Sequence, residues 1–296
     1  MKGALLKMET NLRQSETKIT VEGILASKDL EIITDKNNNQ GIRGNLAIKV
    51  DDLNTIRFKV YVGEKTSKGE KNKAWDGMMT VMNEYKSIAD VGAENADKVR
   101  VGKGTFSTYR NQNGVDVVQY QSNFFNRVEG ELNPARKFSV EGFVKSKVWE
   151  TDSEGNETGR LKIKVIAPNF NGIDILDLIA PKESDGSANF SGIADDLFEV
   201  GNTYQIQGEI VNSRVVKKAV AALGSLEGET EYKNELIITG ASPAYEEERA
   251  YNADAIQLAI QNYEDTQAQN QLRKEKVPFE QSKPSAAKVG RSGLSF

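Results

Sequence analysis

Apolar and polar residues alternate with a period of two through most of the first 240 residues of the chain. In residues 56–62, with the sequence IRFKVYV, every second residue is apolar, and residues 18–25 and 46–50 follow the same rule. Such alternation is typical of a β-strand with one face in a core and the other in water. The chain is therefore predicted to be mainly β.

One segment breaks this period. In residues 74–88 the apolar side chains of Trp75, Met78 and Met82 recur at spacings of three and four, which predicts a short helix with one apolar face. Strand patterns return at 99–110 and 115–127, separated by the hairpin signal Asn113-Gly114. The predicted order of this first unit is β-β-β-α-β-β.

The order then repeats. Residues 137–144, KFSVEGFV, parallel residues 18–25, KITVEGIL, and residues 161–165 parallel residues 46–50. In this second unit, further strands are predicted at 173–179, around 208–210 and at 234–240, with a short helix at 191–198. A repeat of more than 100 residues indicates two copies of one domain rather than a solenoid.

Five strands with a helix between the third and the fourth is the order of the OB-fold, a small Greek-key barrel. Its long first strand must bend to pair with two partners, and Gly23 and Gly142 stand where that bend is expected. We predict two tandem OB-fold-like five-stranded barrels followed by a C-terminal helix and a disordered tail. The alternative is a pair of generic β-sandwich modules.

Composition shifts set the expected boundaries. Pro134 marks a linker, an excess of Asp and Glu marks residues 246–265, and two prolines among Ser, Ala and Gly mark the basic C-terminal segment. The predicted parts are an N-terminal arm (1–17), a first barrel (18–130), a linker (131–136), a second barrel (137–244), an acidic helix (245–276) and a disordered basic tail (277–296).

The chain contains neither cysteine nor histidine. Disulfides, thiolate or imidazole metal sites and Ser-His-Asp catalysis are therefore impossible. We expect a non-enzymatic binding protein that needs no cofactor and no metal. No apolar run approaches the roughly 20 residues that span a bilayer, and no signal peptide is recognisable, so a cytoplasmic location without membrane contact is expected. The net charge of −4 means that any nucleic-acid surface must be a local patch.

The strongest candidate patch lies on the predicted third strand of the first barrel. Arg57, Lys59 and Tyr61 all point outward there, and OB-folds bind single strands with cations along the backbone and aromatic side chains stacked on bases. The competing interpretation is an ordinary solvated strand face. The complete set of predicted nucleic-acid-binding residues is Arg43, Lys49, Arg57, Lys59, Tyr61, Tyr109, Arg110, Trp149, Arg160, Lys162 and Lys164.

Two further segments modify this picture. Residues 119–127 are rich in aromatic, amide and Arg side chains, and either Phe124 or Phe125 must face outward if the strand is regular. In the second barrel, Asp174 and Asp177 replace the cations of the third strand. We therefore expect the second barrel to bind phosphate more weakly.

Tandem OB-like repeats, the absence of zinc ligands and a hydrophilic tail resemble the single-stranded DNA-binding proteins of bacteriophage replication modules. The resemblance covers about residues 18–240 and includes the basic and aromatic second and third strands. It departs from the usual bacterial proteins of this class at the C-terminus, where GRSGLSF (290–296) is basic rather than acidic.

This resemblance implies a protein that coats single-stranded DNA with low sequence specificity during phage replication or recombination. Its expected partners are single-stranded DNA, further copies of itself along the strand and other replication proteins, in the bacterial cytoplasm. Two alternatives are a β-rich phage structural or assembly protein and an RNA-binding OB-fold protein. Salt-dependent binding to oligo-dT would distinguish a DNA-binding protein from the structural alternative. Competition between oligo-dT and oligo-U would distinguish it from the RNA-binding alternative.

Overall fold

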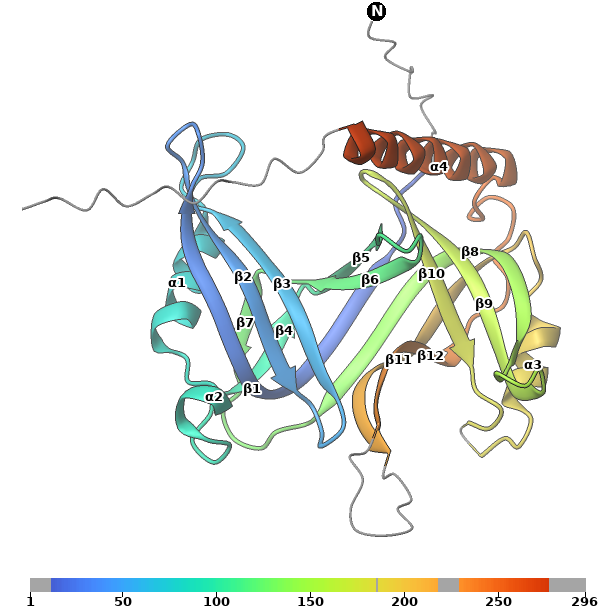
Figure 1. The fold of residues 1–296 in the computed structure, drawn as a ribbon, viewed down its shortest axis with the longest axis horizontal. Coiled ribbons are helices and arrows are strands. Elements are labelled where there is room, and N and C mark those ends of the chain that lie inside the picture. Colours follow the sequence, from blue (N-terminus) through green and yellow to red (C-terminus); the bar gives the residue numbers. More distant parts are fainter. Residues whose placement is uncertain (1–11, 185, 218–228, 277–296) are drawn as a thin grey trace, which may run out of the picture.

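Two barrels lie side by side, and a long C-terminal helix packs on the second (Figure 1). The structure is a computed structural model that describes residues 12–184, 186–217 and 229–276. The predicted basic tail, 277–296, lies outside these residues, as does most of the predicted N-terminal arm.

The first barrel has five strand positions, two of which are each broken into two pieces. Its long first strand pairs antiparallel with the second and the fourth, and the third pairs parallel with the fifth. This is the closure of an OB-fold. The elements are β1 (Thr17–Thr34), β2 (Gln40–Lys49), β3 (Thr55–Gly63), α1 (Lys73–Glu84), α2 (Ile88–Val91), β4 (Lys98–Gly102), β5 (Thr105–Arg110), β6 (Asp116–Gln121) and β7 (Phe124–Arg127).

The second barrel closes in the same way. Its ring runs β8-β9-β10-β12-β11 and back to β8, and the β10–β12 pair is parallel. The prediction of two tandem OB-fold-like barrels in a mainly β chain is therefore confirmed, and the sandwich alternative is not. The elements are β8 (Ala135–Thr151), β9 (Glu157–Asn169), β10 (Gly172–Ala180), α3 (Phe190–Leu197), β11 (Thr203–Lys217) and β12 (Glu229–Ala241), followed by α4 (Ala253–Lys276).

The two predicted bend glycines have the expected role. A Cβ on Gly23 would collide with the carbonyl oxygen of Lys49, and one on Gly142 would collide with the side chain of Val165. In both first strands a β-bulge follows two to four residues after the glycine, between Leu25 and Ser27 in β1 and between Val144 and Ser146 in β8. Only glycine allows the neighbouring strand to approach this closely where the first strand changes partners.

The structure breaks three elements that the sequence pattern predicted as continuous. The predicted strand 99–110 is interrupted at Lys103, whose φ of 49° is left-handed, and the predicted strand 115–127 is interrupted at Ser122 and Asn123. The Ser122 hydroxyl donates to the carbonyl of Gly102 across the two breaks, at 2.7 Å. The predicted helix 74–88 divides because a new capping box starts at Ser87.

The two barrels are joined through their first strands. β1 pairs antiparallel with β8 from Thr17 opposite Val140 to Glu22 opposite Ala135. Ile19 lies opposite Phe138, which occupies the same position in the repeat, 119 residues later. The pairing is thus self-complementary, as across the two-fold axis of a homodimer.

Each barrel also sends a hairpin onto the other. The β5–β6 hairpin reaches the second barrel, where the amide of Thr108 donates to the buried carboxylate of Asp174 at 2.5 Å. In return, the amide of Asn212 on β11 donates to Oδ1 of Asn54 at the β2–β3 turn, at 3.2 Å. Together with the β1–β8 pairing, these contacts fix the position of one barrel relative to the other.

The C-terminal helix is shorter than predicted. α4 begins at Ala253 rather than at residue 245, because Asn252 accepts the amide of Ala255 as an N-cap and residues 246–250 form a turn. Its apolar side chains cover the outer face of the second barrel, and this cluster contains Ile166, Ile173, Ile175, Ile256, Ala259 and Ile260. None of the described helices is long and apolar enough to cross a membrane.

Candidate nucleic-acid interface

The outward face of β3 carries the residues that the sequence singled out. Burial alternates along the whole strand, so that Ile56, Phe58, Val60 and Val62 lie in the core while Arg57, Lys59 and Tyr61 are exposed. Arg57 and Lys59 form no ion pair with any described residue, and 62% of Tyr61 is exposed. Two unneutralised cations therefore lie beside an available aromatic ring.

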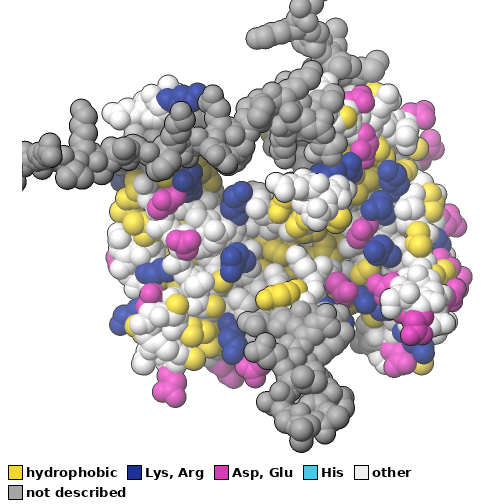
Figure 2. All heavy atoms as spheres, viewed as in Figure 1, with side chains coloured by type: hydrophobic (Ala, Val, Ile, Leu, Met, Phe, Trp, Pro, Cys, Tyr) yellow, Lys and Arg dark blue, Asp and Glu magenta, His cyan; other side chains and the backbone are white. Residues whose placement is uncertain are grey.

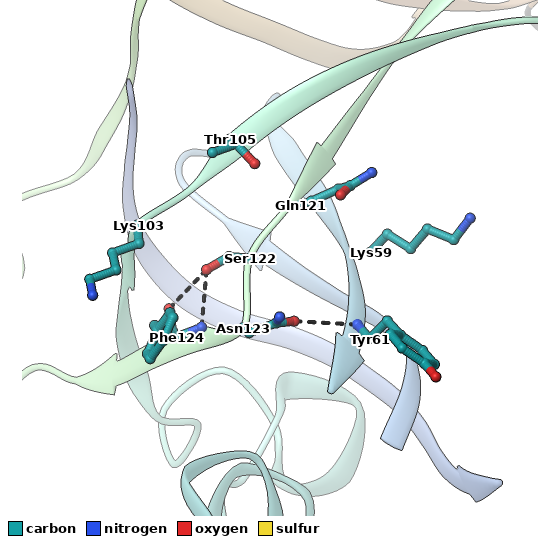
Figure 3. A pocket seen from close by; sticks show the side chains of 8 residues that line it. All are labelled: Lys59, Tyr61, Lys103, Thr105, Gln121, Ser122, Asn123 and Phe124. Atoms are coloured by element: carbon teal, nitrogen blue, oxygen red, sulfur yellow. Dashed lines mark hydrogen bonds between the residues drawn. The ribbon is translucent and has the colours of Figure 1, made fainter. Parts of the chain in front are cut away.

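A pocket of about 410 Å³ opens next to this strand. Figure 3 shows Lys59 and Tyr61 of β3 on one side of it and Lys103 and Phe124 on the other, with the β6–β7 break between them. The lining is polar and aromatic without any acidic side chain: Lys59, Tyr61, Lys103, Thr105, Gln121, Ser122, Asn123 and Phe124.

Six of these eight residues were absent from the predicted site, among them the aromatic Phe124 and the cationic Lys103. Phe125 is buried against Phe58, with ring centroids 5.9 Å apart, whereas 41% of Phe124 is exposed. The expectation that one of the two faces outward is confirmed. The ammonium of Lys103 lies 5.1 Å from the centre of the Phe124 ring. Lys103 reaches this position through its left-handed backbone, which strand alternation could not indicate.

Hydrogen bonds hold the back of the pocket. Asn123 accepts the backbone N–H of Tyr61 through Oδ1 at 3.3 Å, and Gln121 donates from Nε2 to the hydroxyl of Ser107 at 2.8 Å. The Ser122 hydroxyl accepts the amide of Phe124 at 3.1 Å. These bonds join β3, β5 and β6. They therefore hold in place the backbone from which the aromatic and cationic side chains of the pocket project.

The two predicted cations of β2 lie beside this face but are paired. Arg43 forms a salt bridge with Glu31 at 2.7 Å, and Lys49 forms one with Asp52 at 2.9 Å. All four side chains are well exposed, and exposed pairs contribute only about 0–1 kcal/mol. A phosphate can therefore compete for Arg43 and Lys49, which makes them secondary candidates at the edge of the patch.

Arg110, unlike Arg43 and Lys49, is held by ion pairs that join two elements of the fold. Its guanidinium pairs with Asp116 at 3.0 Å and with Glu264 of α4 at 2.6 Å, and it lies over the ring of Tyr263 at 5.2 Å. The hydrogen bonds that Arg110 donates to Glu264 and Asp116 raise the pKa of Arg110 above its ordinary value. Arg110 thus fastens the β5–β6 hairpin to α4, and its charge is unavailable to phosphate. Its neighbour Tyr109 is 49% exposed on the same hairpin.

In the second barrel, acidic side chains neutralise two of the three predicted cations. Arg160 pairs with Glu235 at 2.8 Å and Glu150 at 3.3 Å, and Lys164 pairs with Asp177 at 2.6 Å. Lys162 is exposed and has no ion pair within the described part of the chain. Trp149 packs partly against the core, so only part of its ring could stack on a base.

The expectation that Asp174 takes the place of an outward-facing cation is wrong. It is 5% exposed and accepts hydrogen bonds from Thr108 and Asn169. Burial raises the pKa of Asp174, and these hydrogen bonds only partly offset that effect. The β5–β6 hairpin covers this carboxylate, a contact between repeats that alternation within one strand cannot reveal.

The face of the molecule drawn in Figure 2 shows the same contrast. In Figure 2, Lys and Arg side chains gather over β3 beside a hollow between the barrels, whereas over the second barrel they are interspersed with Asp and Glu. Across the described residues, no group of three or more acidic side chains is arranged to hold a metal ion. The site is thus a cationic and aromatic surface.

Comparison with known proteins adds a family. The family model of YorF matches residues 16–276. This chain belongs to the YorF family. The match spans both barrels and α4, so this YorF family protein contains the tandem architecture as one unit. No curated protein matches it.

Solved structures with some similarity to this YorF family chain include the wild-type single-stranded DNA-binding protein from Thermus aquaticus, with a TM-score of 0.47, 9% identity and coverage of 79% of this chain and 95% of that chain. A deletion mutant of the same protein gives 0.48 and 10%, with coverages of 79% and 97%. A replication protein A heterotrimer bound to single-stranded DNA gives 0.21 and 10%, with 79% and 67%. With TM-scores below 0.5, these likenesses carry no argument, and the fold assignment rests on the strand pairing.

Proposed function

We propose that this protein binds single-stranded DNA with low sequence specificity on the outward face of its first barrel. The observation that carries the proposal is the pairing of unneutralised cations with exposed rings: Arg57 and Lys59 beside Tyr61, and Lys103 beside Phe124. The context of phage replication or recombination, with further copies of the chain and other replication proteins as partners in the bacterial cytoplasm, is part of the same proposal. So is a role without catalysis.

The spacing of the cations suits a nucleic-acid backbone. Arg57 and Lys59 are two residues apart on a strand, so their side chains leave the same face about 7 Å from one another. Lys103 adds a third positive charge across the pocket. Phosphate contacts of this kind do not depend on sequence and weaken with salt.

The exposed rings favour single strands over duplexes. Tyr61 and Phe124 can stack only on a base whose face is free, and in a duplex the neighbouring base pairs cover both faces of each base. Stacking also tolerates any base, which supports low specificity. An RNA strand offers the same phosphates and base faces, so RNA binding is the second candidate.

The test is a fluorescence-anisotropy titration of the full chain with labelled oligo-dT, a duplex of equal length and oligo-U, each over a series of salt concentrations. We expect tight binding to oligo-dT that weakens with salt, and much weaker binding to the duplex. Equal affinity for the duplex, or binding that does not change with salt, would contradict the proposal. Preference for oligo-U would favour the RNA alternative.

A further inference from the structure

The pocket beside β3 contains two hydrogen-bonding groups that the described protein leaves unused. Gln121 donates from Nε2 to Ser107, so its Oε1 remains an acceptor without a hydrogen-bond partner among the described residues. Asn123 accepts the Tyr61 amide through Oδ1, and its Nδ2 donates to no other described residue. One acceptor and one donor therefore lie within a pocket bounded by aromatic rings.

Their positions are fixed by their existing bonds. The amide of Gln121 is oriented by Ser107 on β5, and that of Asn123 by the backbone of Tyr61 on β3. Figure 3 shows both side chains between the two sides of the pocket, with Lys59 and Lys103 farther out. The cations are thus placed to contact the phosphates of a nucleic-acid strand, and the two amides are placed to contact a base.

We propose that this pocket binds one unpaired base by its Watson–Crick edge. For thymine, N3–H donates to Oε1 of Gln121 and a ring carbonyl accepts from Nδ2 of Asn123, while the ring packs against Tyr61 or Phe124. The inference rests on the proposed function, and it adds a reason for selecting single strands, because base pairing occupies this edge in a duplex.

This arrangement also agrees with low sequence specificity. Each of the four DNA bases presents at least one donor and one acceptor on its Watson–Crick edge, so a single pair of amide groups accepts them all with small differences. The pocket volume of about 410 Å³ leaves room for either a purine or a pyrimidine. The pocket therefore tests whether a base is paired rather than which base it is.

The experiment compares short oligomers in which every base is thymine, N3-methylthymine or uracil. N3-methylation removes the donor and blocks the edge but leaves the stacking face and the phosphates intact. With the full chain we expect N3-methylation to weaken binding roughly five- to tenfold, the amount expected for about one net hydrogen bond. Uracil lacks only the 5-methyl group, which lies off this edge, and should bind like thymine.

Variants assign the effect to the pocket. Gln121→Leu removes the acceptor, so the penalty for N3-methylation should fall to less than about twofold, whereas Gln119→Leu on the same strand but outside the pocket should leave it unchanged. Thermal unfolding verifies that both variants are folded, and Asn123→Ala gives a second measure. If wild-type protein binds the methylated oligomer as tightly as oligo-dT while its binding still depends on salt, the edge contact is wrong and the proposed function stands. Absence of binding to either oligomer would overturn both.

Discussion

The two barrels share one fold but differ in how their cations are used. In the first barrel, Arg57 and Lys59 face solvent without a carboxylate partner among the described residues, whereas in the second Arg160 and Lys164 are paired with Glu235 and Asp177. In the parallel ladder that closes each barrel, Lys59 lies opposite Gln121 in the first and Ile179 lies opposite Ile237 in the second. The position that is cationic in one repeat is therefore apolar in the other.

The difference indicates a division of roles between duplicated units. α4 packs on the outer face of the second barrel and buries an apolar cluster there, while the first barrel has an open pocket beside β3. Residue type alone does not distinguish the two faces, since both carry Lys and Arg. What separates them is whether the chain provides a carboxylate within hydrogen-bonding distance.

The largest expected effect comes from removing the unpaired cations. Combining Arg57→Gln, Lys59→Gln and Lys103→Gln should weaken binding to oligo-dT by at least about 4.5 kcal/mol at low salt, given roughly 1.5 kcal/mol or more for each charged contact. The slope of log affinity against log salt should fall by about 2, since each phosphate contact contributes about 0.7. Titrations at several salt concentrations measure both quantities.

The matched control changes Arg160, Lys162 and Lys164 to Gln in the second barrel. Two of these cations already pair with carboxylates, so the slope should change by less than 1. An equal loss in both triple variants would show that the two barrels contribute alike and would end the proposed division.

The next effect concerns the buried glutamate that both repeats keep. Glu141 is fully buried and pairs with Arg13, and Glu22 is nearly buried and pairs with Arg100. Burial alone would raise the pKa of Glu141, but hydrogen bonds from Arg13, the Glu16 amide and Tyr251 outweigh it and lower that pKa. Arg13→Ala leaves the buried charge without its main partner and should reduce the free energy of unfolding by about 3 kcal/mol.

The sign of the pH dependence follows from this lowered pKa. A carboxylate with a lowered pKa stabilises the folded state above its unfolded value, near 4.5, and this contribution is lost as the pH falls through the folded value. Urea unfolding should therefore separate wild type from Arg13→Ala at pH 7, and the difference should shrink as the pH falls below 4.5 and through the lowered pKa of Glu141. Arg100→Ala, the matched change in the first barrel, should behave in the same way. A constant difference at all pH values would exclude the ion pair as its cause.

A smaller effect distinguishes Tyr61 from Trp149, the candidate stacking residue of the second barrel. Tyr61→Ala should weaken binding to oligo-dT by about 1–3 kcal/mol, because an exposed ring is lost from the interface. Trp149→Ala should leave the dissociation constant nearly unchanged and lower the unfolding temperature, because Trp149 packs partly against the core. If Trp149→Ala instead weakened binding as much as Tyr61→Ala, the second barrel would also stack on bases.

The smallest effect is expected at Arg110. Arg110→Ala removes the contacts to Asp116 and Glu264 that join the β5–β6 hairpin to α4. We expect a loss of about 1.5 kcal/mol in unfolding free energy and unchanged affinity for oligo-dT. A reduced salt slope in this variant would return Arg110 to the set of phosphate contacts.

The sequence predicted the barrels well because strand alternation and the repeat are local signals. The burial of Ile56, Phe58, Val60 and Val62 follows directly from their spacing. The sequence could not predict which cations are neutralised. Arg110 pairs with the carboxylate of Glu264 on α4, which is 154 residues away in the chain and is brought near only by the fold. Lys103 was missed because its left-handed backbone places it off the strand alternation.

The most direct measurement of the central claim is photocrosslinking of the full chain to an oligomer of 5-bromodeoxyuridine, followed by mass spectrometry of the peptides. The account predicts adducts in the first barrel, at Tyr61 on β3 or at Phe124 beside the pocket. Excess unlabelled oligo-dT should abolish these adducts, whereas excess duplex should not. Adducts confined to residues 157–180 of the second barrel would contradict the claim that the first barrel holds the single strand.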